Sequence, residues 1–206
     1  MKIIQMMKQL NNTELGKGGT HDTYVLVPNE LNISQIFDQP DHNYEFIDIS
    51  SGDRIRARNT IGREKRIVGL GQYYRNQNLS AGDSIVFEKR IDGTNIRYRI
   101  WTIKLQKAIV FQKMKNGFEI LTPDRLNAAQ KWGELLTEQL NISFLEAIKK
   151  RNDSPDTTDI YKITIAGKSI GDSFSAKENG IIEMSGEKVV VRRFYGWKTI
   201  TVEEDE

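Results

Sequence analysis

The stretch SIVFEKRIDGTNIRYRIWTI, residues 84–103, decides the fold class that we expect for this chain. Two runs of strand-forming residues, Ser84–Arg90 and Asn95–Ile103, flank a turn whose Asp92-Gly93 pair is the usual chemistry of a β-hairpin. Residues 107–113 and 117–121 continue the pattern and are joined by a second short turn. The sequence therefore predicts consecutive strands that are connected by short turns.

Strand patterns also precede this hairpin, and only two short helices interrupt them. Alternating or apolar runs predict strands within residues 23–31, 44–50 and 53–59, and short helices at 31–38 and 72–78. A doubly wound parallel sheet would need helices between its strands, which this spacing does not provide. We therefore expect a mainly β fold with α elements, a small barrel or open pseudobarrel with two short helices.

The composition changes at Leu121. Thr122-Pro123-Asp124 is a typical helix start, and apolar residues then recur at helical spacing as far as Leu140. A second helical stretch is expected at residues 143–151, followed by a polar linker at 152–159 and strands at 160–167, 180–186 and 188–202. We expect two domains: a barrel at residues 1–120 and an appended helix-and-sheet lobe of unknown role at 121–206.

Charge is distributed very unevenly along the chain, although its formal net charge is only +2. Residues 1–53 carry 3 basic and 8 acidic side chains, residues 54–115 carry 15 and 4, and residues 116–206 carry 12 and 16. Such a basic block in a nearly neutral protein favours an anionic partner, because uncompensated charge repels itself. The alternative is a solvated basic face or a ribbon of cross-strand ion pairs.

Composition also excludes several kinds of site. The chain has no cysteine, so disulfides and thiolate metal sites are excluded. It has only two histidines, which are too few for a His-rich metal site. No apolar run reaches membrane-spanning length, and the first ten residues are too polar for a secretory signal. We expect a soluble cytoplasmic protein that has no cofactor and no membrane partner.

The basic block is densest at residues 54–66, where six of thirteen residues are Arg or Lys. On a strand, Arg54, Arg56 and Arg58 would share one face at about 7 Å spacing. The following run GREKR, residues 62–66, combines guanidinium and ammonium donors with the Glu64 acceptor. Arg can contact guanine with two hydrogen bonds in the major groove, and a carboxylate can accept from the cytosine amino group. This mixture favours base readout, although Glu64 could instead neutralise a neighbouring side chain.

A metal-dependent nuclease is the catalytic alternative for such a chain. Its usual core needs an Asp, followed on a nearby strand by an acidic residue and a Lys with one residue between them. Within the expected barrel, Asp83 with Glu88 comes nearest, but Arg90 stands where Lys is required. In the lobe, an unusual Mg²⁺ site would involve the following residues: Asp156, Asp159, Lys162, Glu183 and Glu187.

Two segments resemble the N-terminal effector domain of EcoRII-type restriction endonucleases. GREKRIVGLG, residues 62–71, is similar to a charged segment of that domain, and NNTELGKGGTHDTYVLVP, residues 11–28, is similar to its N-terminal arm. LSAGDSIVF, residues 79–87, resembles a turn and strand of the same fold. Together the matches cover about residues 8–120. The resemblance implies a DNA-binding pseudobarrel of the kind shared with plant auxin-response transcription factors.

In that family an N-arm and a C-arm close on the major groove, and the resemblance implies the same division here. The N-arm is Asn11–His21 and the C-arm is Arg56–Arg66. In the N-arm, Thr20 is an extra residue between the glycine pair and His21 that the family pattern lacks. The implied DNA contacts are Asn12, Thr13, Lys17, His21, Arg56, Arg58, Asn59, Arg63, Glu64, Lys65 and Arg66. Glu64, Lys65 and Arg66 fall on the matching motif and would read bases.

The sequence thus predicts a sequence-specific reader of double-stranded DNA, the effector part of a restriction-modification system. Further partners to consider are a nuclease domain or subunit and a second copy of the chain. The first alternative is a compact Mg²⁺-dependent type II restriction endonuclease with its active site in the C-terminal lobe. The second is a basic module that binds RNA or an acidic protein. Tyr73, Tyr74, Trp101 and Phe111 are expected in the core rather than stacked on bases.

Overall fold

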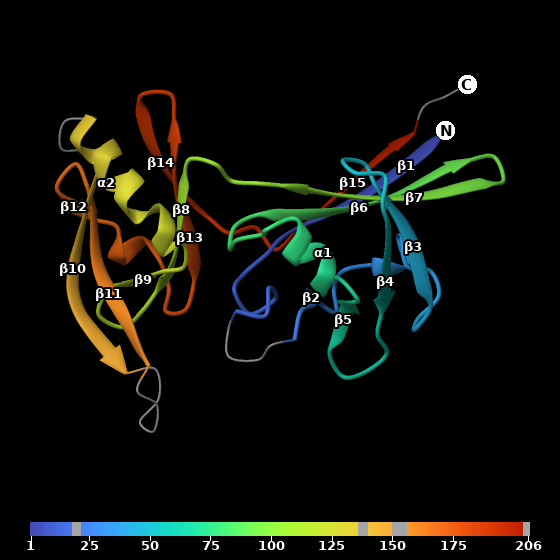
Figure 1. The fold of residues 1–206 in the computed structure, drawn as a ribbon, viewed down its shortest axis with the longest axis horizontal. Helices are drawn as coiled ribbons and strands as arrows, with labels where there is room; N and C mark the ends of the chain where they lie inside the picture. The colour runs from blue at the N-terminus through green and yellow to red at the C-terminus, as the bar shows by residue number, and fades with distance from the viewer. Residues whose placement is uncertain (18–21, 136–139, 150–155, 204–206) are drawn as a thin grey trace. The chain divides into compact units, whose positions relative to one another are not determined.

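The chain divides into two compact units, and the second is inserted into the first. The structure, a computed structural model, describes residues 1–17, 22–135, 140–149 and 156–203. Unit 1 consists of Met1–Lys104 and Tyr195–Glu206, and unit 2 consists of Leu105–Phe194 (Figure 1). These units differ in extent from the division that composition suggested at residue 120. Residues 105–120 lie in unit 2 because their strands pair there, and the last strand returns to pair with the first.

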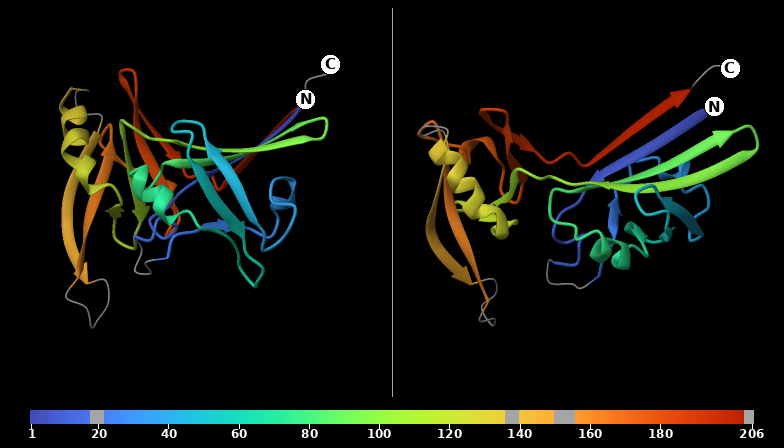
Figure 2. Two further views of the ribbon diagram at one scale, coloured as in Figure 1. Left: turned by 45° about the vertical axis from the view of Figure 1, so that its right-hand side comes forward. Right: turned by 45° about the horizontal axis from the view of Figure 1, so that its top comes forward.

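Unit 1 is built on one eight-stranded sheet that curls into a half-barrel (Figures 1 and 2). Its strand order is β15-β1-β6-β7-β3-β4-β5-β2. All neighbours are antiparallel except β3 and β7, which pair in parallel. The strands are β1 (Lys2–Gln9), β2 (Val25–Val27), β3 (Asn43–Asp48), β4 (Arg54–Asn59), β5 (Lys65–Val68), β6 (Ser84–Asp92), β7 (Asn95–Ile103) and β15 (Trp197–Glu203).

Alternation along the strands separates a buried inner face from an outer face. In β3, Tyr44, Phe46 and Asp48 are buried while the residues between them are exposed. Phe37, Tyr44, Phe46, Phe87 and Tyr98 form a network of ring contacts with centroids 5.2 to 5.5 Å apart, most of them edge-to-face. This aromatic cluster forms the centre of the half-barrel core, because large rings bury much apolar area and interlock at such angles.

Two short helices accompany the half-barrel, as predicted. The segment expected as a helix at residues 31–38 forms only the single 3-10 turn η1 (Ile33–Gln35), although Ile36 and Phe37 beyond it are buried. The second is α1 (Gly71–Asn76), which buries Tyr73 and Tyr74 and so confirms their place in the core.

The two edge strands of the half-barrel approach each other through side chains. The Trp197 indole at the start of β15 donates a hydrogen bond of 2.9 Å to the Leu26 carbonyl in β2. Trp197 also packs against the core. The edges of the curled sheet are therefore joined by a side-chain contact rather than by strand pairing.

Unit 2 is a seven-stranded sheet with helix α2 packed against it (Figure 1). The order is β10-β11-β9-β8-β13-β14, with β12 paired to β11. Phe111, Phe118 and Phe174 pack edge-to-face in its core. Its elements are β8 (Ala108–Lys113), β9 (Phe118–Ile120), η2 (Pro123–Arg125), α2 (Leu126–Leu135), β10 (Leu140–Lys149), β11 (Thr157–Ile165), β12 (Lys168–Ser169), η3 (Gly171–Ser173), β13 (Asn179–Ser185) and β14 (Lys188–Arg193).

The helix expected at residues 143–151 is wrong, because the described part of that segment belongs to strand β10. Leu140 and Ile142 pair opposite Ile165 and Ile163 of β11; Leu140, Ile142 and Ile163 are buried in the core, and Ile165 packs against it. This pairing outweighs the local helix preference, since strand stability depends on partners distant in sequence. The expected strand at 188–202 is likewise divided into β14 and β15, which belong to different units.

Candidate nucleic-acid interface

Strand β4 presents its three arginines on the outer face of the half-barrel, as the alternation predicted. Ile55 and Ala57 face the core, whereas Arg54 and Arg56 are exposed and Arg58 is half-buried. Arg54 forms an ion pair of 3.0 Å with Glu45, and Arg58 forms one of 2.8 Å with Asp41. Arg56 forms no ion pair with any residue that the structure describes. The ribbon of ion pairs weighed as an alternative is therefore present only in part.

Arg66 on β5 is held by two neighbours. Its guanidinium donates a hydrogen bond of 2.7 Å to Glu64 and lies 4.3 Å from the centre of the Tyr24 ring. The hydrogen bond to Glu64 raises the pKa of Arg66, and the ring face attracts its positive charge. The backbone of Arg66 is also tied to Thr60, by hydrogen bonds of 2.8 and 3.2 Å. Glu64 therefore does pair with a neighbour, and the pair places an acceptor beside a guanidinium whose position is restrained.

Register places Arg66 on the same face as the β4 arginines. Val68 lies opposite Arg58, and Arg66 lies opposite the exposed Leu26 of β2. Because alternate residues of a strand point to the same side, Arg66, Val68 and Arg58 share the outer face. Arg58 and Arg66, predicted from separate parts of the motif, are thus brought together on adjacent strands.

Two other predicted contacts lie on the opposite side of these strands. Asn59 is 5% exposed, and its side-chain oxygen has no hydrogen-bond partner among the described residues. Lys65 lies opposite the buried Val27, so it is on the side of β5 opposite to Arg66. Its side chain is nevertheless exposed. The predicted triplet of base readers is therefore split, with Arg66 on the outer face and Lys65 on the other. Arg63 is exposed in the loop between β4 and β5.

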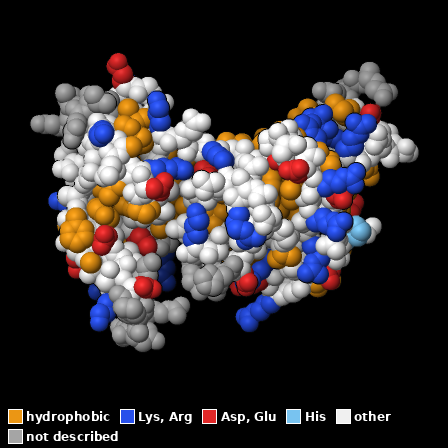
Figure 3. All heavy atoms as spheres, viewed as in Figure 1, with side chains coloured by type: hydrophobic (Ala, Val, Ile, Leu, Met, Phe, Trp, Pro, Cys, Tyr) orange, Lys and Arg blue, Asp and Glu red, His pale blue; other side chains and the backbone are white. Residues whose placement is uncertain are grey.

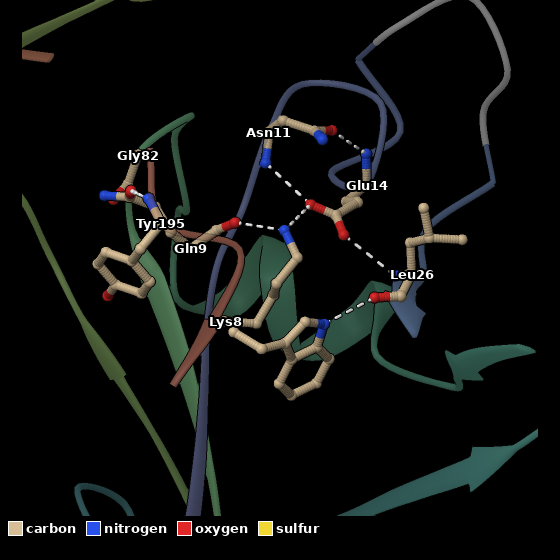
Figure 4. Close-up of polar contacts among 8 residues, drawn as sticks. Lys8, Gln9, Asn11, Glu14, Leu26, Gly82 and Tyr195 are labelled. Atoms are coloured by element: carbon tan, nitrogen blue, oxygen red, sulfur yellow. Dashed lines mark hydrogen bonds and ion pairs between the residues drawn. The ribbon is translucent and has the colours of Figure 1, made fainter. Parts of the chain in front are cut away.

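The N-arm begins in a turn that a buried carboxylate anchors (Figure 4). Glu14 accepts hydrogen bonds of 3.0 Å from the Lys8 ammonium, 3.1 Å from the Asn11 backbone N–H and 3.0 Å from the Leu26 N–H. The Asn11 side chain in turn accepts a bond of 2.9 Å from the Glu14 N–H. This reciprocal arrangement resembles a capping box, and it connects the arm to β1 and β2 at once.

The remaining N-arm residues have more modest contacts. Asn12 is half-buried and its carbonyl accepts the Lys17 N–H at 2.8 Å, while Thr13 is exposed. The Lys17 ammonium donates a hydrogen bond of 2.9 Å to the Leu79 carbonyl. His21 lies outside the described residues. The structure therefore attaches the N-arm to the half-barrel, whereas the residues of its tip are not described.

Sequence reasoning missed two residues on which this arrangement depends. Tyr24 was read only as part of a strand, although its ring supports Arg66. Glu14 was not singled out at all, although the Asn11-x-x-Glu14 spacing is a capping-box signal that would have indicated a structural role. Nothing local in the sequence indicated that Tyr24 meets Arg66, because the β2 and β5 strands that bring them together are far apart in the chain.

The acidic residues of the nuclease alternative are dispersed or already paired. Glu183 accepts two hydrogen bonds from Arg192, of 3.0 and 3.2 Å. Asp159 and Lys162 are exposed on β11, and Glu187 is exposed in the turn between β13 and β14. Within the described ranges, no group of three His, Asp or Glu side chains lies close enough to hold a metal ion.

No protein-family profile matches this chain, and no curated protein does. Among solved structures, the N-terminal domain of Helicobacter pylori LlaJI.R1 is similar with 17% sequence identity and a TM-score of 0.36. The similarity covers 51% of this chain and 82% of that chain. A TM-score this low does not establish a shared fold, so it assigns neither fold nor function. Among the described residues, no helix has the length and apolar character needed to cross a membrane.

Proposed function

We propose that the half-barrel binds double-stranded DNA in a sequence-specific manner, as the recognition part of a restriction-modification system. In this proposal the half-barrel is an open pseudobarrel of the EcoRII effector type, in agreement with the resemblance of residues 11–28 and 62–71. The observation that carries the proposal is the restrained Arg66–Glu64 pair beside the outer-face arginines of β4. A guanidinium that is already oriented loses less conformational freedom when it forms two hydrogen bonds to guanine.

The division of roles follows from charge and position. Arg66 and Glu64 would read bases, because they offer donors and an acceptor at the end of a rigid strand pair. Arg56 would contact a phosphate, since its guanidinium is exposed and has no ion-pair partner among the described residues. Lys65 would reach DNA only from the other side of β5, so a phosphate contact suits it better than a base.

Selection of duplexes from a randomised pool tests the proposal. The purified chain is mixed with the pool with and without Mg²⁺, and bound strands are sequenced with their ends mapped. A short enriched site with intact ends supports the proposal. No enrichment, with binding that disappears at moderate salt, would contradict it. Enrichment together with cleaved ends would establish the endonuclease alternative instead.

Arg66→Lys tests the role of the Arg66 guanidinium group at the selected DNA site. We expect a loss of about 1–3 kcal/mol in discrimination at one base pair, because Lys keeps the charge but cannot form two parallel hydrogen bonds. Arg193→Lys is the matched control: Arg193 is an exposed arginine of unit 2 that also pairs with a glutamate, Glu178, at 2.9 Å and lies 5.9 Å from a ring, that of Phe174. If the Arg66 variant lost the same affinity for every DNA sequence, Arg66 would contact only the DNA backbone.

A further inference from the structure

A second group of arginines lies on the outer face of the half-barrel, on the β6–β7 hairpin. Arg90 pairs opposite Arg97, and Glu88 pairs opposite Arg99. The Glu88 side chain is only 1% exposed, and it accepts hydrogen bonds of 2.7 Å from Arg90 and 2.7 Å from Gln5. Arg99 lies 3.3 Å from the same carboxylate. One buried carboxylate therefore holds two guanidinium groups in place.

These guanidinium groups remain accessible although they are restrained. The side chains of Arg90 and Arg99 are 35% and 32% exposed. Each arginine has five N–H donors, and the bonds to Glu88 use only a part of them. The remaining N–H donors of these two oriented guanidinium groups suit a tetrahedral anion such as a phosphate group, which guanidinium groups bind with two hydrogen bonds.

Folding stability does not account for Arg97. Its side chain is exposed and lies directly opposite Arg90, and like charges that face each other across a strand pair are destabilising. Arg97 forms no ion pair with any described residue, and neither does Asp92, the acidic residue two positions beyond Arg90 on the same face. A charge that costs stability and has no internal partner indicates an external anion.

The β6–β7 arginines continue the outer face that carries Arg58 and Arg66. Ile47 of β3 lies opposite Arg99 of β7 on one side and opposite Arg54 of β4 on the other, so all three share that face. Arg99 and Arg54 are thus two strand spacings apart, about 10 Å. That is about three base-pair steps of 3.4 Å along the axis of the duplex. In Figure 3, Lys and Arg side chains gather over the part of unit 1 that contains β7 and β3.

We propose that Arg90, Arg97 and Arg99 form a phosphate-contact site for the DNA backbone outside the base pairs that the arms read. This inference rests on the proposed function, because it takes the same duplex as the ligand. The site is a sheet face rather than a projecting loop, and Glu88 already occupies part of its donors, so it suits the regular backbone better than base edges. Such contacts fix the register of the protein on DNA and add affinity that depends on salt.

Substitution of Arg97 by Gln tests the site without disturbing the Glu88 contacts. Affinity for the selected duplex and for a scrambled duplex is measured over a range of salt concentrations. We expect the slope of log affinity against log salt to decrease by about 0.9, the value for one phosphate contact, on both duplexes. The ratio of the two affinities stays unchanged. Lys115→Gln, an exposed charge in the β8–β9 turn of unit 2, is the matched control and leaves the slope as in the wild type.

The outcomes separate the two proposals. If the wild type prefers the selected duplex but Arg97→Gln leaves the salt slope unchanged, the phosphate site is refuted and the proposed function stands. If no duplex is preferred by the wild type, the proposed function fails, whatever the slope does. If Arg97→Gln instead lowers binding to polyglutamate and leaves the DNA slope unchanged, the face binds an acidic protein and the inference is overturned.

Discussion

Substitution of Glu14 by Gln removes the charge that anchors the N-arm to the half-barrel while it keeps the shape of the side chain. Glu14 is 2% exposed and its partner Lys8 is 11% exposed, so the substitution leaves an ammonium in a nearly dry site. Breaking such a buried pair from one side costs about 3–5 kcal/mol. The Lys8 ammonium also donates to the Gln9 carbonyl at 2.6 Å, which places the expected cost at the lower end of this range.

Hydrogen bonding adds a second reason for a large effect. The Glu14 carboxylate accepts from three donors, Lys8, the Asn11 N–H and the Leu26 N–H. An amide has only one acceptor oxygen, so its NH₂ group must face at least one of these donors. Each buried donor left without an acceptor costs about 1–3 kcal/mol, a contribution already included in the cost of breaking the pair. A loss of about 3 kcal/mol is a large fraction of the stability of an ordinary domain.

Hydrogen exchange read by peptide is the assay, because it separates unit 1 from unit 2. We expect faster exchange throughout the β1, β2 and β6 peptides of the Glu14→Gln variant, and unchanged exchange in the unit 2 core. Glu187→Gln, an exposed turn residue of unit 2, is the control and changes stability by less than about 0.5 kcal/mol. The double variant Lys8→Met with Glu14→Gln should be less destabilised than the sum of the two single variants, because no unpaired charge remains.

Two results would refute this reasoning. A cost below about 1 kcal/mol for Glu14→Gln would mean that water reaches the Lys8 ammonium and that the pair behaves as a surface ion pair. A double variant that loses the full sum of the single effects would mean that Lys8 and Glu14 act independently, and the turn would then need another anchor.

Two further predictions concern the acid stability of the chain and the packing of the unit 2 core. Hydrogen bonding from Tyr44 is the main cause that lowers the pKa of Asp38, so the ionised form stabilises the fold above the usual aspartate pKa. This stabilisation is lost as the pH falls through the lowered pKa of Asp38. Because Asn cannot titrate, the thermal midpoint of Asp38→Asn should fall less than that of the wild type between about pH 4 and pH 2. Gly180→Ala should destabilise unit 2 by about 1–3 kcal/mol in denaturant unfolding, because the new methyl group would overlap the rings of Phe111 and Phe174. Gly196→Ala meets no atom within 4 Å and serves as the control, so equal effects of the two would contradict the steric argument.

Much of unit 1 could be predicted because its signals are local. The β6–β7 hairpin follows from alternation around an Asp-Gly turn, and the shared face of the β4 arginines follows from the two-residue period of a strand. Burial of Tyr73 and Tyr74 follows from their apolar neighbours on a short helix. Each of these features depends on residues that are close in sequence, so the chain encodes it within a few positions.

Other parts could not be predicted because they depend on distant partners. β1 was not expected as a strand at all, yet it lies between β15 and β6 inside the sheet. The segment in β10 has a helical pattern and becomes a strand only by pairing with β11. Asn59 was expected at DNA and lies buried, because β4 is covered on that side by the half-barrel core.

The sequence by itself determined the mainly β class, the strong basic middle third and the arginine-rich stretch from Arg54 to Arg66. Only the tertiary structure decided that Tyr24 supports Arg66, that Glu14 anchors the N-arm, and that Arg90, Arg97 and Arg99 share a face with the β4 arginines. The reason is physical: composition and strand period act over a few residues, whereas these contacts arise from register between strands that are distant in the chain.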